Sequence, residues 1–168
     1  ILQAVRPGDA ADQVYILDLA TGGINRASMG KGKCTCAYFL PDGRFLYSST
    51  HHHGDEPPPR PDRSKGYIWP LYRTFDVFLC DPARGTLDRI VDNDGYDAET
   101  TVSEDGKRAI FTSHRDGGIG LYTMNVDGTD VRKVNHRPGY AGGAFFSPDG
   151  SRIVYRAFYP RTADEKSE

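Results

Sequence analysis

The chain has 168 residues, with 21 basic and 23 acidic side chains and a formal net charge of −2. This charge provides no general attraction to nucleic acid or to an anionic membrane surface, so neither is an expected partner. No apolar run approaches the ~20 residues that a membrane-spanning helix needs, so no span is expected. The 19 glycines and 11 prolines favour tight turns, and together with 10 Tyr and 8 Phe they predict an all-β protein of short strands.

The sequence contains three copies of one pattern. A turn of the Ser-Pro-Asp-Gly type recurs in FLPDGRFLYSS from Phe39, VSEDGKRAIFTS from Val102 and FSPDGSRIVYRA from Phe146. The second and third copies lie 44 residues apart, and the first and second lie 63 apart because of an insertion. A fixed period of 20–50 residues is typical of solenoids and propellers. We place the repeats at about 14–50, 76–113 and 120–158, the insertion at 53–74 and a tail at 159–168.

Each copy predicts four antiparallel strands. A strand of small and apolar residues precedes the Asp-Gly turn, and an alternating strand such as 152–155 follows it. A third strand at 121–124 and a fourth at 131–134 then flank a second turn. Four strands in about 44 residues match one blade of a β-propeller, so the chain is predicted to hold three blades' worth of strands.

The predicted strands are out of phase with whole blades. We expect the chain to begin with the third and fourth strands of one blade, at 14–28, and to end with the first and second of another, at 142–156. Known rings use about four to eight blades, so three do not close. Two copies that exchange half-blades would close a six-bladed ring as a homodimer; the alternative is that the chain is a fragment. Residues 1–168 thus form a single, partial propeller domain with partner surfaces at both ends.

The segments LYTMNVDGTDVRKV (121–134) and FSPDGSRIVYRA (146–157) resemble the TolB-type propeller repeat, and the resemblance covers residues 14–158. It implies a bacterial, exported protein, periplasmic or secreted, that acts as a binding scaffold. The chain opens on Ile1, which indicates a processed N-terminus or an excerpt of a longer protein. Similar repeats form the gating propeller of prolyl oligopeptidase relatives and the catalytic propeller of oligogalacturonate lyases. No catalytic residue is assigned, because no G-x-S-x-G, P-loop or HExxH motif is present.

A candidate metal site follows from aligning the copies. In a propeller the first strand of each blade lines the channel, and the alignment puts Cys36 and Glu99 at one equivalent position and His51 and His114 at another. Imidazole, thiolate and carboxylate are ligands of Zn²⁺ and Mn²⁺, so these four residues form the candidate site. The resemblance to lyases with a histidine-rich channel metal supports this reading. The alternative is a set of polar mouth loops whose histidines share no role.

A candidate calcium loop lies at 92–95, where the sequence Asp-Asn-Asp-Gly precedes Asp97 and Glu99. Calcium binds several oxygens on a tight turn, but the full twelve-residue loop pattern is missing and the segment is equally a plain turn. We therefore expect no cofactor, with a divalent Mn, Zn or Ca ion as the alternative.

The insertion 53–74 combines a stiff, proline-rich segment with the only tryptophan of the chain. A long loop of this kind is either a lid that binds ligand or a plug packed over the channel. The predicted ligand contacts at the mouth and on this loop are His51, His52, Arg63, Tyr67, Trp69, Asp97, Glu99, His114 and Arg115.

Two functional hypotheses follow. The first is a non-enzymatic scaffold that binds a protein or a glycan at the channel mouth near the insertion. The second is a metal-dependent enzyme acting on polysaccharide, either a lyase or a hydrolase, centred on the channel.

Overall fold

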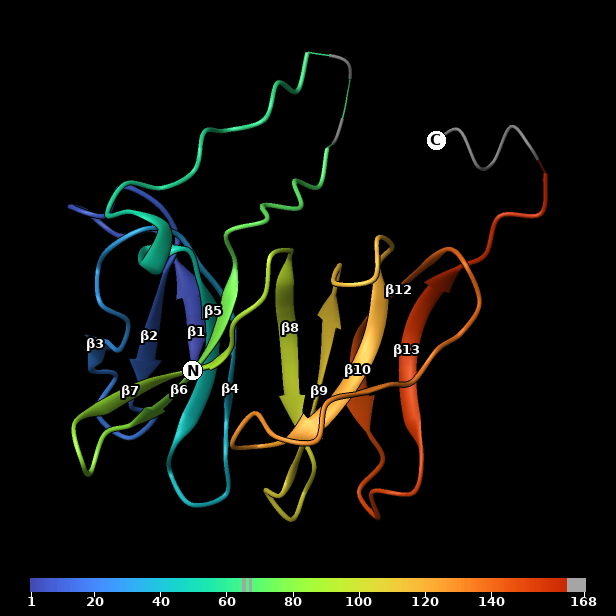
Figure 1. Cartoon of the computed structure of the whole chain (residues 1–168). Helices are drawn as coiled ribbons and strands as arrows, with labels where there is room; N and C mark the ends of the chain where they lie inside the picture. Colours follow the sequence, from blue (N-terminus) through green and yellow to red (C-terminus); the bar gives the residue numbers. More distant parts are fainter. Residues whose placement is uncertain (65, 67, 163–168) are drawn as a thin grey trace.

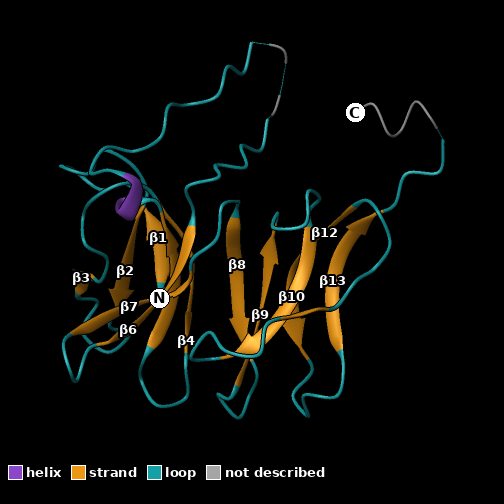
Figure 2. Cartoon of the chain, viewed as in Figure 1, coloured by secondary structure: helices purple, strands orange, loops and turns teal. Residues whose placement is uncertain are grey.

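The computed structural model describes residues 1–64, 66 and 68–162, and these form an all-β structure (Figures 1 and 2). The described residues contain thirteen strands, and one turn of 3-10 helix at His51–His53. Two sheets are complete, four-stranded and antiparallel, as the sequence predicted for propeller blades. Blade I contains β4 (Cys34–Phe39), β5 (Phe45–Ser49), β6 (Asp76–Asp81) and β7 (Thr86–Val91). Blade II contains β8 (Asp97–Val102), β9 (Arg108–Ser113), β10 (Gly120–Asn125) and β11 (Arg132–Lys133).

Two incomplete sheets flank these blades. The N-terminal sheet contains β1 (Leu2–Ala4), β2 (Gln13–Leu17) and β3 (Ile24–Arg26), and the C-terminal sheet contains β12 (Tyr140–Phe146) and β13 (Ile153–Phe158). The four sheets stand side by side, with β8 packed between β4 and β12 (Figure 1). Each of β4, β8 and β12 is the first strand of its sheet in the chain, which makes these three the inner strands of a propeller.

The N-terminal sheet has one more strand than we expected. We predicted that the strands begin at 14–28, but β1 pairs with β2 and places Leu2 opposite Tyr15. A three-residue strand contains no run of alternating apolar residues, so the sequence pattern could not reveal it. β1 occupies the position of a second strand. In the predicted half-blade exchange, β13 of a second copy would therefore reach β2 only after displacing β1.

The hydrophobic core lies between the sheets, which pack face to face. Blades I and II bury one cluster between them, which includes Leu46, Phe111 and Met124. Because β5 is covered on both faces, all five of its residues are buried, whereas five of the six residues of β13 are exposed. Each large side chain buried in this way contributes ~1.5–3 kcal/mol, so the interfaces between blades hold the described sheets together.

The same β-bulge interrupts all three inner strands. The pairing of each inner strand with the second strand of its sheet shifts register at this point. One residue of each bulge has a left-handed backbone: Cys36 at φ 52°, Glu99 at 58° and Gly143 at 61°. This conformation costs a non-glycine residue ~1–2 kcal/mol. Cys36 and Glu99 keep it, and the contacts of their side chains, described below, offset the cost.

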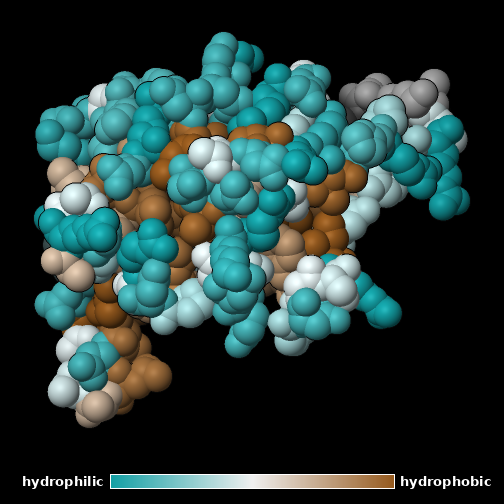
Figure 3. All heavy atoms as spheres, turned by 60° about the horizontal axis from the view of Figure 1, so that its bottom comes forward, coloured by the Kyte–Doolittle hydropathy of each residue, from teal (hydrophilic) through white to brown (hydrophobic). Residues whose placement is uncertain are grey.

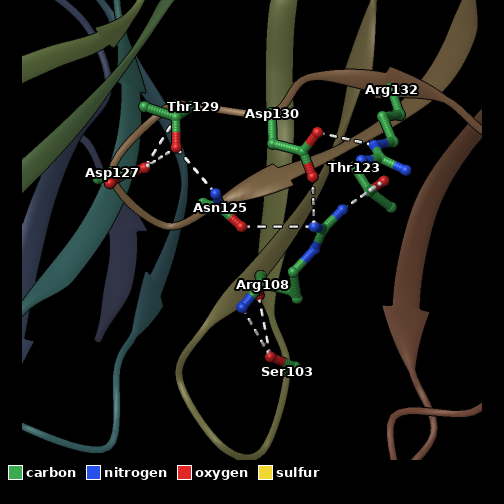
Figure 4. A network of polar contacts seen from close by, with 8 residues as sticks. All are labelled: Ser103, Arg108, Thr123, Asn125, Asp127, Thr129, Asp130 and Arg132. Carbon is green, nitrogen blue, oxygen red and sulfur yellow. Dashed lines mark hydrogen bonds and ion pairs between the residues drawn. The ribbon is translucent and has the colours of Figure 1, made fainter.

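At the end of blade II that carries the turns between β8 and β9 and between β10 and β11, Arg108 links β9, β10 and the loop before β11 (Figure 4). Its guanidinium donates to Asp130 at 3.0 Å, Thr123 at 3.0 Å and Asn125 at 3.4 Å. Arg132 donates to the second oxygen of Asp130 at 2.7 Å. The network fixes the loop that carries Asp130, whose backbone is also left-handed.

The face formed by these turns is mostly polar, with hydrophobic side chains visible between the turns (Figure 3). Among the residues that the structure describes, no helix is long and apolar enough to cross a membrane.

Candidate functional site

The insertion 53–74 stands at the opposite end of the blades, which we call the mouth (Figure 1, top). It begins in the 3-10 turn after β5 and returns to the start of β6. The backbone carbonyl of Asp55 accepts a hydrogen bond from the Gly32 amide at 2.6 Å, and its carboxylate pairs with Lys31 at 2.8 Å. The Tyr72 hydroxyl donates to the Pro59 carbonyl at 2.8 Å and so ties the two legs of the insertion together.

Trp69 connects the tip of the insertion to blade II. Its indole N–H hydrogen-bonds to the hydroxyl of Tyr96, which is 4 % exposed, while 48 % of Trp69 itself is exposed. Burial raises the pKa of Tyr96, so its hydroxyl stays protonated at physiological pH. Trp69 is therefore held at one edge and open to solvent over much of its surface.

Three neighbouring cavities lie beneath the insertion, and we call them together the groove. The first, of about 390 Å³, includes Lys33, Arg60, Arg63 and Tyr72 in its wall. The second, of about 230 Å³, shares Lys33, Arg63 and Tyr72 with it and extends to Trp69 and Tyr96. The third, of about 210 Å³, shares Trp69 and Tyr96 with the second and is completed by Leu71, Glu99, Thr112, Ile119, Tyr140 and Arg156. The shared residues show that the three cavities adjoin one another, in a row from the N-terminal sheet to β13.

Arg156, on β13, forms one wall of the third cavity. Its guanidinium lies 5.5 Å from the centre of the Trp69 ring and 5.3 Å from that of Tyr140, within cation–π range. It also donates a hydrogen bond to the Tyr140 hydroxyl at 2.8 Å. A positive charge and two aromatic faces thus meet at a single point of the groove.

Glu99 lies at the base of the third cavity and reaches across to the C-terminal sheet. Its carboxylate accepts a hydrogen bond from the Thr112 hydroxyl at 2.6 Å and another from the Gly143 amide at 2.8 Å. The backbone amide of Glu99 in turn hydrogen-bonds to the thiol of Cys36, whose pKa is raised by burial. The Cys36 amide donates to the Gln3 side chain at 3.4 Å. Each bulge amide is thus bound by a side chain of the preceding sheet.

The predicted equivalence of His51 and His114 is wrong by one residue. Strand pairing sets Cys34 opposite Ser49 in blade I and Asp97 opposite Ser113 in blade II. Two residues after each serine come His51 and Arg115, and each hydrogen-bonds to that serine, at 2.8 and 3.0 Å respectively. The turn of blade II contains one more residue than that of blade I, which shifts the second strand relative to an ungapped alignment.

Two of the three consecutive histidines, His51 and His52, pack on Phe78 and on each other, whereas His53 turns to a carboxylate. The His51 ring lies 4.4 Å from that of Phe78, and burial lowers the pKa of His51 to about 4, so it is neutral at physiological pH. The His52 ring lies 4.9 Å from that of Phe78. His53 approaches the buried carboxylate of Asp76 at 3.1 Å.

Asp97 and Arg115 form a partly buried ion pair at the mouth end of blade II, at 3.3 Å. Burial is the leading influence on Asp97 and raises its pKa, in opposition to hydrogen bonds from Ser113 and Asn93 and to the charge of Arg115. The backbone of His114 is fixed by a hydrogen bond from its amide to the Tyr96 carbonyl at 3.0 Å.

The structure brings Cys36 and Glu99 into contact, but His51 and His114 do not complete a metal cluster with them. Within residues 1–64, 66 and 68–162, no three His, Cys, Asp or Glu side chains are grouped as metal ligands. In the predicted calcium loop each aspartate pairs with a different arginine: Asp92 with Arg89, Asp94 with Arg73 and Asp97 with Arg115. Metal binding by this chain therefore stays a prediction.

Of the predicted ligand contacts, Arg63, Trp69 and Glu99 line the groove. Tyr67 lies outside the described residues. The site also includes residues that we did not predict as ligand contacts, namely Gln3, Lys33, Tyr96, Tyr140 and Arg156. Tyr96 and Tyr140 lie 44 residues apart, so the repeat marks them, although repetition does not distinguish a ligand contact from packing.

No family model matches the chain. Over 54 residues it is 41% identical to dipeptidyl-peptidase 5 of Porphyromonas endodontalis, a match of 32% of this chain and 8% of that protein. Over 101 residues it is 27% identical to an uncharacterized protein of Agrobacterium fabrum, a match of 55% of this chain and 33% of that protein. The chain thus spans a third or less of the length of these curated relatives.

Two solved structures have a similar fold. TolB from Acinetobacter baumannii superimposes with a TM-score of 0.62 and 20% identity, over 86% of this chain and 31% of that one. Putative TolB from Agrobacterium tumefaciens superimposes with a TM-score of 0.71 and 20% identity, over 94% of this chain and 50% of that one. Strand order, blade size and these superpositions agree, and the chain has the fold of part of a β-propeller ring, similar to the propellers of these TolB structures.

Proposed function

We propose that this propeller scaffold binds a protein or a carbohydrate ligand at its mouth, in the groove beneath the insertion 53–74. The observation that carries the proposal is the groove itself. Its three cavities, of about 390, 230 and 210 Å³, together fall in the ~300–1,000 Å³ range of ordinary ligand sites. Aromatic side chains with a few charged groups are the usual lining of such a site.

The proposal assigns the insertion the role of a lid rather than a plug. A plug would bury its large apolar side chains against the inner strands, whereas Trp69 and Ile68 are 48 % and 41 % exposed. The lid is also held at both legs and at Trp69, so the groove exists before ligand arrives. A preformed site avoids the cost of ordering a loop on binding. We further propose that the protein works in the periplasm or outside the cell, in line with the resemblance of its repeats.

The fluorescence of Trp69 tests the proposal directly, because the chain contains no other tryptophan. We suggest titrating the chain with cellohexaose, chitohexaose, hexagalacturonate, hexaglutamate and hexalysine. At least one probe should shift or quench the emission with saturation. The matched variant replaces residues 55–72 by a short glycine-serine linker, and it should keep the β-sheet circular dichroism while losing binding measured by calorimetry. If no probe binds, or if the variant binds as well as the parent chain, the proposal is overturned.

A further inference from the structure

The first leg of the insertion has a surface that faces away from the groove. We propose that residues 56–61, with the sequence Glu-Pro-Pro-Pro-Arg-Pro, form a docking segment for a partner protein. The partner is a domain whose binding groove is lined by aromatic side chains and carries a carboxylate, since aromatic grooves recognise polyproline II helices. This inference goes beyond the proposed function, because it concerns the outside of the insertion and does not depend on the ligand of the groove.

Local chemistry fixes the conformation of this segment. Prolines at positions 57, 58, 59 and 61 each hold φ near about −65°, and the residue before a proline is restricted to extended backbone. Every residue from 56 to 61 is constrained in one of these two ways, and residues 57–63 contain no helix, strand, turn or bend. Such a run is a polyproline II helix, which makes no hydrogen bonds within itself. It cannot pair as a β-strand, because proline has no N–H to donate.

The helix presents two of its three edges to solvent. Because a polyproline II helix has about three residues per turn, Pro58 and Pro61 share one edge. Both are half-buried and line the first cavity, so this edge faces the fold. On the next edge Arg60 is exposed and Pro57 is half-buried. The last edge is exposed at all three of its residues, 56, 59 and 62. A partner therefore finds two adjacent edges open.

The fold holds this segment in place before a partner arrives. The insertion projects beyond the ends of the blades, so a second domain has room to approach it (Figure 1). The carboxylate of Asp55, just before the segment, pairs with Lys31 at 2.8 Å. The Tyr72 hydroxyl donates to the Pro59 carbonyl at 2.8 Å, within the segment itself. A segment that is already ordered loses less conformational entropy on binding, which favours its recognition.

Arg60 gives the segment a charge that a partner can recognise. Its side chain is exposed, and no carboxylate in the described part of the chain pairs with it. A guanidinium forms two parallel hydrogen bonds with a carboxylate, so the partner should place an acidic side chain beside this edge. The neighbouring edge carries Glu56 and the exposed ring of Pro59. An aromatic side chain of the partner suits that edge, whereas a second carboxylate there would be repelled.

Two purified domains test the proposal by calorimetric titration of the chain. One is a Src-homology-3 domain whose groove combines aromatic pockets with acidic side chains, and the other is a WW domain whose groove is aromatic without them. We expect the first to bind saturably, with Kd below about 1 mM, and at least about tenfold more tightly than the second. The variant in which a glycine-serine linker replaces residues 55–72 should bind neither domain.

Single substitutions assign the binding to the two open edges. Arg60→Gln should weaken binding of the first domain about tenfold, because it removes a charge-assisted contact. Pro59→Ala should weaken it at least about threefold, because it removes an apolar ring while the other prolines keep the backbone extended. The matched controls are Arg84→Gln and Pro82→Ala, since both residues are exposed on the turn between β6 and β7. Both controls should bind like the parent chain.

The opposite results would overturn the proposal. If neither domain binds, or if the linker variant binds as well as the parent chain, residues 56–61 are only a rigid wall of the lid. Equal losses in the segment variants and in their controls would also contradict it. A free peptide of residues 55–62 that binds more tightly than the chain would show that the fold hides the segment rather than presenting it. None of these results affects the groove, so the proposed function is tested separately.

Discussion

The carboxylate of Glu99 binds the backbone amide of Gly143, which occupies the same bulge position in the next sheet of the ring. The Glu99 amide is bound in turn by Cys36 of the preceding blade. The three inner strands are thereby connected at matching points, by side chains whose own backbone is left-handed. The relay ends at Gly143, because glycine has no side chain to extend it. We infer that the bulges set the spacing of the inner strands below the groove.

Glu99 is the first residue to test in this relay. Glu99→Ala removes the acceptor for both Thr112 and Gly143 and leaves two donors near the base of the groove unpaired. We expect the free energy of unfolding to fall by about 1–3 kcal/mol in urea titrations followed by circular dichroism. Glu104→Ala is the control, since Glu104 is exposed on a turn of the same blade. A loss no larger than that of the control would contradict the relay.

His51 makes the stability of the chain depend on pH. Its pKa is lowered from 6.5 to about 4 in the folded chain, mainly by burial, so the unfolded chain binds the proton more readily. The resulting stability is fully present above pH 6.5 and is lost as the pH falls from about 6.5 towards 4. His51→Gln removes this contribution. We expect the difference in unfolding free energy between parent and variant to narrow by about 1 kcal/mol across this range, after allowance for solvent screening. If the difference in unfolding free energy stays constant between pH 4 and 7, the pKa of His51 is the same in the folded and the unfolded chain, and the expectation is wrong.

The metal content of the purified chain tests the predicted ligands. Glu99 accepts hydrogen bonds from the fold, and His51 faces Ser49 and Phe78. We therefore expect less than about 0.1 equivalent of Zn, Mn or Ca by mass spectrometry after dialysis against 1 µM of each ion. A structural metal site binds far more tightly than this concentration, so it would be filled under these conditions. One equivalent of metal in the parent chain that disappears in His114→Ala would instead support the enzyme hypothesis.

The outer edge of β13 is unpaired in the described chain, and Val154 on this strand is 68 % exposed. Exposed strand edges recruit further strands, so we expect chain 1–168 to associate as its concentration rises. Val154→Lys should reduce the associated fraction in light scattering, because charged residues protect an edge. Leu19→Lys is the control, since Leu19 is 91 % exposed outside the strands. A monomer at all concentrations would contradict both this expectation and the homodimer.

Local chemistry made the blade predictable from sequence. The Asp-Gly turns specify hairpins through the backbone freedom of glycine, and the alternating apolar residues specify strands. Both signals act over a few residues and recur with a fixed period, so they can be recognised in the sequence without any knowledge of tertiary contacts. The insertion was equally visible, because it interrupts the repeat between 53 and 74.

The tertiary structure decided what the repeat could not. β1 is stable only because β2 lies beside it. The strand register that makes His51 and Arg115 equivalent positions of the two blades depends on how the hairpins close. The groove brings Lys33, Trp69 and Arg156 together from distant parts of the chain. Periodicity determines which residues form a strand, since that depends on near neighbours. Which side chains meet at the mouth depends on how separate sheets pack, and no local pattern encodes that packing.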